Sequence, residues 1–314
     1  MRDDLGITTK LENGKAYLEF ALPDKIGRLL SALQIEIWEG AEGERLVFHG
    51  EYAPEESDCM TALLLRPHLW DGMRDPYVYL LKAQGRFGTV EVFWRQELAI
   101  YDVRVVDKKG IFLNEKEFLP HEVAYRLPPQ ISDAGTREEQ MRRDLDRLAR
   151  MGVNAIRLEG TGAGTEEQDR CEVRSFYNLC RGRGFLTGDR WIRPEILPVY
   201  RGLPGETTTE ALLEADGRTL TERYYYYQAK WSNEPVLYPA LSTLHRQENG
   251  LLSLTIYSNQ KKVVLYVDGV LFLFQSAASG DPEFIFEDIP VAKLPLHLAA
   301  EAGNLSISLT VTKL

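Results

Sequence analysis

The hydrophobic period of this chain changes twice, and these two changes limit the folds that it can adopt. Residues 1–108 consist of β-rich runs, which are separated by turn sequences such as Asn-Gly and Gly-Arg-Phe-Gly. The runs are KAYLEFAL, LSALQIEIWE, ERLVFHGEY, MTALLLRP, YVYLLKAQ and TVEVFWRQELAIYDVRVV. Short strands at this spacing, without a helical period, predict an immunoglobulin-like β-sandwich.

Helices and strands alternate in the next segment, residues 109–231. The first helix has an apolar face formed by Met141, Leu145 and Leu148, and we expect it to stop at Gly152 before the strand sequence VNAIRLEG. A second helix, expected to stop at Gly184, precedes the strand sequence FLTGD. This β-α-β-α-β order is the repeating unit of a (β/α) barrel or of an open α/β sheet.

Residues 193–222 are rich in Pro, Gly, Thr and Glu, which predicts a loop with a helix at TTEALLEA. Strand sequences return after Pro235 and predict a second immunoglobulin-like sandwich. The expected fold is therefore a multidomain α and β chain with three domains: an immunoglobulin-like β-sandwich at 1–108, a partial (β/α) segment at 109–231 and a second β-sandwich at 232–314.

Composition excludes several classes of partner. The formal net charge is −10 and no Lys/Arg cluster stands out, which argues against nucleic acid. No signal peptide and no apolar run of membrane-spanning length is visible, so we expect no membrane. Cys59, Cys171 and Cys180 fit no metal spacing and predict reduced thiols in a cytoplasmic protein. The scattered histidines predict no metal site, and we expect no cofactor.

Six stretches, in order, resemble the family 2 glycoside hydrolases, the group of the β-galactosidases and β-glucuronidases. They are RPHLW with DPYVY, FLNEK, EEQMRRDLDRLARMGVNAIR, FYNLC, RYYYYQAKW, and YSN with VLYVDG. The resemblance implies a (β/α) barrel between two sandwiches, and hydrolysis of O-glycosyl bonds by two glutamates.

Departures from the family pattern are as informative as the matches. The resemblance implies about five more strand-helix units after Asp189, which carry both catalytic glutamates of the family. Only some 35 residues separate Asp189 from the run of tyrosines that begins at Tyr224. Those units do not fit, so the resemblance predicts a truncated barrel and a protein that lacks the catalytic mechanism of the family.

Three other carboxyl groups are candidates for a rebuilt site. Glu122, Glu159 and Asp189 are expected at or near the carboxyl ends of adjacent strands, where barrel enzymes place their chemistry. Arg126, Arg157 and Arg190 are close to them in sequence, so we expect each carboxyl to stay ionised within a cluster of ion pairs. Such a cluster suits structure better than acid catalysis.

Aromatic residues offer further candidates for a sugar site. Trp191 can stack on a sugar ring, although a packing role is equally compatible with the sequence. Arg157, which matches an active-site position of the family, and Arg126 are further candidates for substrate binding, although Arg157 can equally pair with Glu159 or Glu122. The run Tyr224–Tyr227 favours packing, because only two of four neighbouring helical residues share a face. The glycine-rich sequence 160–164 is a poor fit to a dinucleotide fingerprint and predicts a loop.

These observations predict a glycoside hydrolase family 2-like protein that is catalytically inactive and acts as a carbohydrate-binding or assembly module. Two alternatives stay open: an active O-glycosyl hydrolase with a rebuilt or partner-completed site, and a purely structural scaffold. The open barrel remnant needs a cover. We expect the sandwiches, the 193–222 segment, a second copy or a partner glycosidase chain to provide it.

Overall fold

The computed structural model describes most of the chain. The described residues are 5–22, 29–53, 60–127, 134–159, 166–187, 198–201, 211–214, 218–278 and 280–313. The chain forms two compact units, and each unit is built from two separate stretches of sequence. The first unit comprises Met1–Pro120 with Thr165–Trp191, and the second comprises His121–Gly164 with Ile192–Leu314. The middle segment predicted from the sequence, 109–231, thus contributes to both units.

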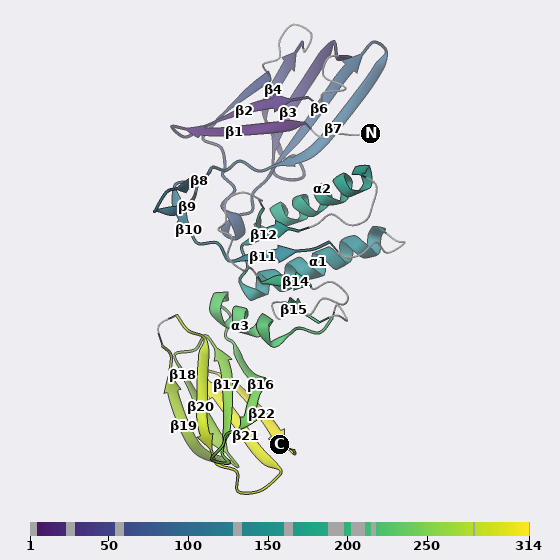
Figure 1. Cartoon of the computed structure of the whole chain (residues 1–314). Helices are drawn as coiled ribbons and strands as arrows, with labels where there is room; N and C mark the ends of the chain where they lie inside the picture. Colours follow the sequence, from purple (N-terminus) through teal and green to yellow (C-terminus); the bar gives the residue numbers. More distant parts are fainter. Residues whose placement is uncertain are drawn as a thin grey trace. The chain divides into compact units, whose positions relative to one another are not determined.

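A β-sandwich forms most of the first unit (Figure 1). One sheet has the order β1-β2-β5 and the other the order β4-β3-β6-β7. The strands are β1 (Gly6–Glu12), β2 (Lys15–Ala21), β3 (Ala32–Glu39), β4 (Arg45–Tyr52), β5 (Met60–Leu65), β6 (Tyr79–Phe87) and β7 (Val90–Leu98). Alternate residues of β2 and β3 point into the core, as the period of two predicts.

The first unit also contains a small sheet and a helix. Strands β8 (Val103–Val106), β9 (Gly110–Leu113) and β10 (Lys116–Phe118) pair in the order β10-β9-β8. Helix α2 (Glu166–Gly182) and strand β13 (Leu186–Thr187) follow much later in the sequence. The indole N–H of Trp70 donates a 3.0 Å hydrogen bond to the carbonyl of Arg181, which joins α2 to the sandwich.

Four parallel strands form the centre of the second unit. They are β11 (Glu122–Tyr125), β12 (Ala155–Leu158), β14 (Val199–Arg201) and β15 (Ala211–Leu213), and their order is β12-β11-β14-β15. Helix α1 (Ala134–Met151) buries Met141, Leu145 and Leu148, as the sequence predicts. Gly152 ends this helix with a φ of +89°.

The helix predicted at TTEALLEA, within the segment 193–222, was wrong. Within the described residues this segment provides β14 and β15, and the predicted helix at TTEALLEA is replaced by β15. Leu212 and Leu213 are buried and their strand pairs with β14, so tertiary packing overrides the local preference. The segment therefore covers the edge of β11, which was one of the covers expected for the open sheet.

A second sandwich completes the second unit, as the sequence predicts. Its sheets have the orders β16-β17-β20 and β19-β18-β21-β22. The strands are β16 (Leu237–Arg246), β17 (Leu252–Ser258), β18 (Lys262–Val267), β19 (Val270–Ser276), β20 (Glu283–Ile289), β21 (Leu296–Ala302) and β22 (Leu305–Val311). Counted from the first strand of each, the two sandwiches have the same strand order. The chain is thus a mostly β, multidomain protein with two β-sandwiches.

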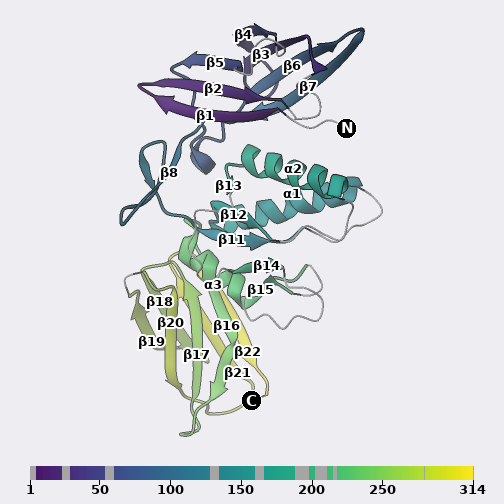
Figure 2. The ribbon, with the colours of Figure 1, turned by 45° about the horizontal axis from the view of Figure 1, so that its top comes forward.

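Helix α3 (Glu222–Trp231) joins the parallel sheet of the second unit to its sandwich (Figure 2). The run Tyr224–Tyr227 lies on this helix. The Tyr225 ring stacks on Tyr238 of β16 at a centroid distance of 3.8 Å. Tyr224 is buried, and its hydroxyl donates a 3.0 Å hydrogen bond to the carbonyl of Arg147 on α1. The packing role predicted for the tyrosines is confirmed.

Candidate functional site

Four charged side chains form a chain of ion pairs on one face of the parallel sheet in the second unit. Because side chains alternate along a strand, Glu122 and Arg126 point to the same side as Arg157 and Glu159 of the neighbouring strand. Nη2 of Arg126 lies 3.6 Å from Oε2 of Glu159, whose Oε1 lies 3.7 Å from Nη2 of Arg157. Nε of Arg157 lies 4.0 Å from Oε1 of Glu122. We call these four residues the charged cluster.

The position expected for Glu122 was wrong. Glu122 is the first residue of β11 and pairs in register with Ala155, the first residue of β12, so it lies at the amino end of the sheet. Just before the strand, the His121 N–H donates a 2.7 Å hydrogen bond to Oδ1 of Asn154, and the His121 carbonyl accepts from the N–H of Ala155. Glu159 does follow the carboxyl end of β12, as expected.

The surroundings of Glu122 oppose the ionisation that the sequence predicts for it. Its side chain is 2% exposed, and Oε2 has no hydrogen-bond partner. Burial raises the pKa of Glu122 to about 7, because the ionised form loses its water; the nearby Arg157 charge lowers the pKa, and Glu159 raises it. The attraction of Arg157 is weaker than the cost of burial, since its nearest nitrogen is 4.0 Å away. A buried carboxyl that holds its proton near neutral pH can act as an acid.

A second polar cluster, which sequence reasoning missed, lies on the opposite face of the sheet. Asp144 of α1 is 1% exposed and accepts hydrogen bonds from the hydroxyls of Tyr125, at 3.0 Å, and Tyr200, at 2.8 Å. Arg201 donates to the same carboxylate at 3.4 Å, and Arg147 lies 3.9 Å from it. Burial raises the pKa of Asp144, while the Tyr200 hydrogen bond and the Arg201 charge lower it.

This second cluster is built from groups that hold one another in place. The Tyr125 and Tyr200 rings stack with centroids 5.5 Å apart, so β11, β14 and α1 are fixed together. The signal in the sequence was the spacing of Asp144: it lies three residues after Met141 and four before Leu148, on the apolar face of the helix. A charged residue on a buried face needs a partner, and the tyrosines provide it.

Several sequence candidates lie outside the described residues. They are Asp189, Arg190, Trp191 and the glycine-rich sequence 160–164. The structure therefore brings together Glu122, Glu159, Arg126 and Arg157 of the predicted set. Among the described residues, no three His, Cys, Asp or Glu side chains are placed to bind one metal ion.

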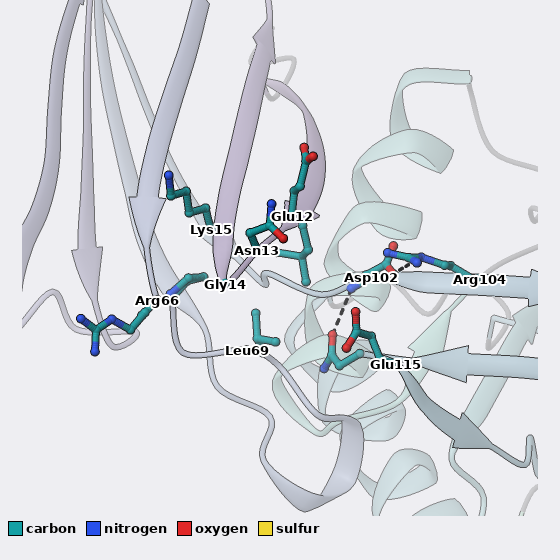
Figure 3. Close-up of a pocket in the computed structure, with 12 residues that line it drawn as sticks. Glu12, Asn13, Gly14, Lys15, Arg66, Leu69, Asp102, Arg104 and Glu115 are labelled. Carbon is teal, nitrogen blue, oxygen red and sulfur yellow. Dashed lines mark hydrogen bonds and ion pairs between the residues drawn. The ribbon is translucent and has the colours of Figure 1, made fainter.

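A cavity of about 310 Å³ lies in the first unit, between the β1–β2 turn and the β8–β10 sheet (Figure 3). Nε of Arg104 lies 2.5 Å from Asp102, and the backbone N–H of Asp102 donates to Oδ1 of Asn114. Asn114 in turn donates a 2.8 Å hydrogen bond to the Trp70 carbonyl. Asn114 has a positive φ of 49°, which fits a tight hairpin turn. The hydrogen bonds and the ion pair hold the loops around the cavity together.

No helix among the described residues is long and apolar enough to cross a membrane. The cytoplasmic location remains a prediction.

Comparisons with known proteins define the fold. The chain matches no family model and no curated protein. Solved structures do match. An FMN-binding β-glucuronidase from Facaelibacterium prausnitzii L2-6 is 14% identical at a TM-score of 0.71, over 99% of this chain and 73% of its own. The β-glucuronidase of Parabacteroides merdae is 11% identical at a TM-score of 0.67, over 98% of this chain and 63% of its own.

A glycosyl hydrolase family 2 member from Bacteroides cellulosilyticus DSM 14838 is also similar. It is 11% identical at a TM-score of 0.64, over 98% of this chain and 62% of its own. Nearly the whole chain thus has the fold of family 2 glycoside hydrolases, and the resemblance predicted from its motifs is confirmed at the level of the fold. The chain spans less than two thirds of two of these three structures, and identities of this size carry the fold alone.

Proposed function

We propose that this chain is a glycoside hydrolase family 2-like protein that binds carbohydrate, or serves as an assembly module, without hydrolysing glycosides. The observation that carries the proposal is the short path from β13 to α3. Between Thr187 and Glu222 the described residues contain two strands of three residues each, β14 and β15. The family resemblance requires about five strand-helix units there to supply both catalytic glutamates.

The same observation supports the finer architecture. We regard 1–108 and 232–314 as immunoglobulin-like domains, and 109–231 as a degenerate partial (β/α) barrel. In this interpretation β14 and β15 replace the missing barrel strands beside β11. A homo-oligomer or a partner glycosidase chain is the expected cover for what remains open.

The charged cluster is the proposed sugar-binding face. Arg157 carries five N–H donors, and its ion pairs with Glu159 and Glu122 are 3.7 and 4.0 Å long, so its guanidinium can donate to sugar hydroxyls. The Glu159 carboxylate can accept hydrogen bonds from the same hydroxyls. Arg157 and Arg126 are the proposed binding residues, together with Trp191, whose ring suits stacking on a sugar face.

A calorimetric titration with a panel of mono- and oligosaccharides tests binding. We expect at least one sugar to bind wild-type protein, and Arg157→Gln to weaken that binding tenfold or more. Arg142→Gln is the matched control, because Arg142 forms an ion pair with Glu138 on the exposed side of α1. A panel without any binding, or equal weakening by both variants, contradicts the proposed site.

One observation favours a second function, an active O-glycosyl hydrolase. The pKa of Glu122 is raised to about 7, and a glycosidase needs one protonated and one ionised carboxyl. Glu159 or Asp189, or a carboxylate of a partner chain, is the candidate for the second. Turnover of nitrophenyl glycosides that is lost in Glu122→Gln and retained in Glu138→Gln establishes this function.

Binding without turnover supports the carbohydrate-binding module. If neither binding nor turnover is detected, the chain is a structural scaffold, and the assembly role is tested by identifying the proteins that co-purify with it.

A further inference from the structure

The two sandwiches have the same strand order, which makes β4 and β19 equivalent edge strands. They differ sharply in composition. Strand β4 carries charged and polar side chains, including Arg45, His49 and Glu51, and Arg45 donates a 2.8 Å hydrogen bond to Glu39. Charges of this kind commonly prevent an edge strand from pairing with another chain. Strand β19, with the sequence VLFLFQS, has no charged residue.

The apolar side chains of β19 face solvent. Val270 is 69% exposed, Leu271 56% and Phe274 54%. Only Phe272 packs against the core of the sandwich. Ile285 of β20, a strand of the other sheet, is 49% exposed as well. Exposed apolar side chains that follow one another along an edge strand favour an interaction surface over an ordinary scattering of exposed residues.

The backbone of β19 is free on one side. Within the described part of the sandwich, β19 is the last strand of its sheet and pairs only with β18 (Figure 2). Alternate N–H and C=O groups of β19 therefore point away from β18, ready to accept another strand. The seven-residue ladder is long enough for a second strand to pair along it.

We propose that β19 pairs with β19 of a second copy of this chain, in antiparallel orientation across a twofold axis. An uncharged edge strand is complementary to itself in this arrangement, because each copy contributes the same patch. No charged group of the strand has to lose its water. The proposal is independent of sugar binding.

Charge at the two ends of β19 favours the antiparallel orientation. Lys262 lies opposite Ser276 at one end of the β18–β19 hairpin, and Lys261 precedes it. Asp268 lies in the turn at the other end, next to the Val267–Val270 pair. Antiparallel pairing brings the basic end of one copy close to the acidic end of the other. Parallel pairing would place like charges together.

Sedimentation of the full chain over a range of concentrations tests the dimer. We expect a reversible dimer in the wild type, and a dissociation constant at least tenfold higher in Leu271→Lys, since a charge on the edge opposes pairing. Phe93→Lys is the matched control: Phe93 is 53% exposed on β7, another edge strand, and its change should leave the dimer intact.

Two further measurements on the same chain keep the proposal falsifiable if Leu271→Lys fails to fold. In hydrogen exchange, the amides of β19 should gain protection as the wild type dimerises, while those of β4 do not. In mixtures of Val270→Cys and Ser276→Cys chains, a short bismaleimide should link the two variants to each other. Wild-type protein serves as the control for the native cysteines.

A wild type that stays monomeric at every concentration overturns the proposal. So does a dimer whose β19 amides gain no protection, or one that Leu271→Lys and Phe93→Lys weaken equally. Links between two Val270→Cys chains, without links to Ser276→Cys chains, overturn the antiparallel orientation.

Discussion

Arg157 and Glu122 lie on neighbouring parallel strands with 4.0 Å between Nε of the guanidinium and Oε1 of the carboxyl. Nε of Arg157 and the other carboxyl oxygen of Glu122, Oε2, are buried atoms without a hydrogen-bond partner. A closer ion pair would stabilise the ionised carboxylate more strongly. At this separation burial dominates, and the proton on Glu122 stays bound up to a pH of about 7.

The raised pKa of Glu122 makes the stability of the protein depend on pH. A carboxyl with an ordinary pKa of 4.5 that rises to about 7 on folding binds its proton more tightly in the folded state. Its contribution is fully present below pH 4.5 and is lost as the pH rises to about 7, at a cost of about 3 kcal/mol. We therefore expect Glu122→Gln to reduce the fall in melting temperature between pH 5 and pH 8.

The control for this prediction is Glu138→Gln, which removes a carboxylate from an exposed ion pair on α1. It should keep the pH dependence of the wild type. Thermal unfolding at several pH values provides the comparison, and an unchanged slope in Glu122→Gln would mean that Glu122 does not carry the effect.

Neighbouring charges should move the pKa of Glu122 in opposite directions. The Arg157 charge lowers it and the Glu159 charge raises it. Arg157→Gln should therefore raise the pKa above its value of about 7, and Glu159→Gln should lower it. A ¹³C NMR titration of the glutamate carboxyls measures both, with Arg142→Gln as a distant control. Shifts of the same sign in the two variants would disprove the assignment.

Asp144→Asn should destabilise the protein strongly. The change removes the carboxylate that accepts from Tyr125 and Tyr200 and leaves Arg201 and Arg147 beside a neutral amide. Loss of one partner from a buried charged network costs about 3–5 kcal/mol.

Urea unfolding measures this loss. Glu139→Gln, which removes one half of an exposed i,i+4 pair with Arg143, should cost less than about 1 kcal/mol. Similar losses in the two variants would show that the Asp144 network adds little to stability.

Two glycines with similar backbone conformations allow a steric contact to be isolated. Gly152 and Gly250 have φ values of +89° and +84°. A Cβ at residue 152 would lie 2.4 Å from the carbonyl oxygen of Trp231, whereas a Cβ at residue 250 has no neighbour within 4 Å. Gly250→Ala should cost about 1–2 kcal/mol, from the left-handed backbone alone.

Gly152→Ala should cost at least twice as much, because the end of α1 must also move away from the end of α3. The midpoints of chemical unfolding of the two variants decide the matter, and equal midpoints would exclude a tight contact between the helix ends.

Much of the fold was predictable because its signals are periodic. The face formed by Met141, Leu145 and Leu148 extends over about two turns, and this helix is present as predicted. Every β-rich run predicted for the two sandwiches contains a strand. The first strand of each sandwich, β1 or β16, was not predicted. The six motifs, which occur in the order of a known family, also predicted the fold of nearly the whole chain.

Three-residue strands and burial of a single carboxyl were not predictable in the same way. Val199–Arg201 and Ala211–Leu213 are too short to show a repeating pattern, so only their partners in the sheet define them as strands. The sequence places Arg157 near Glu122 but gives neither the 4.0 Å separation nor the exclusion of water. These two quantities decide whether the carboxyl is ionised.

Each unit is built from two stretches of the chain that are interleaved in the sequence. During synthesis, β11 and α1 emerge before α2 completes the first unit, and they must wait for β14 and β15. A fragment that ends at Pro120 would leave the buried Trp70 indole without the Arg181 carbonyl that it binds. The first unit therefore needs a continuous gene segment for residues 1–191, and the second one for residues 121–314. Neither unit can be transferred to another protein as one continuous segment without including part of the other unit.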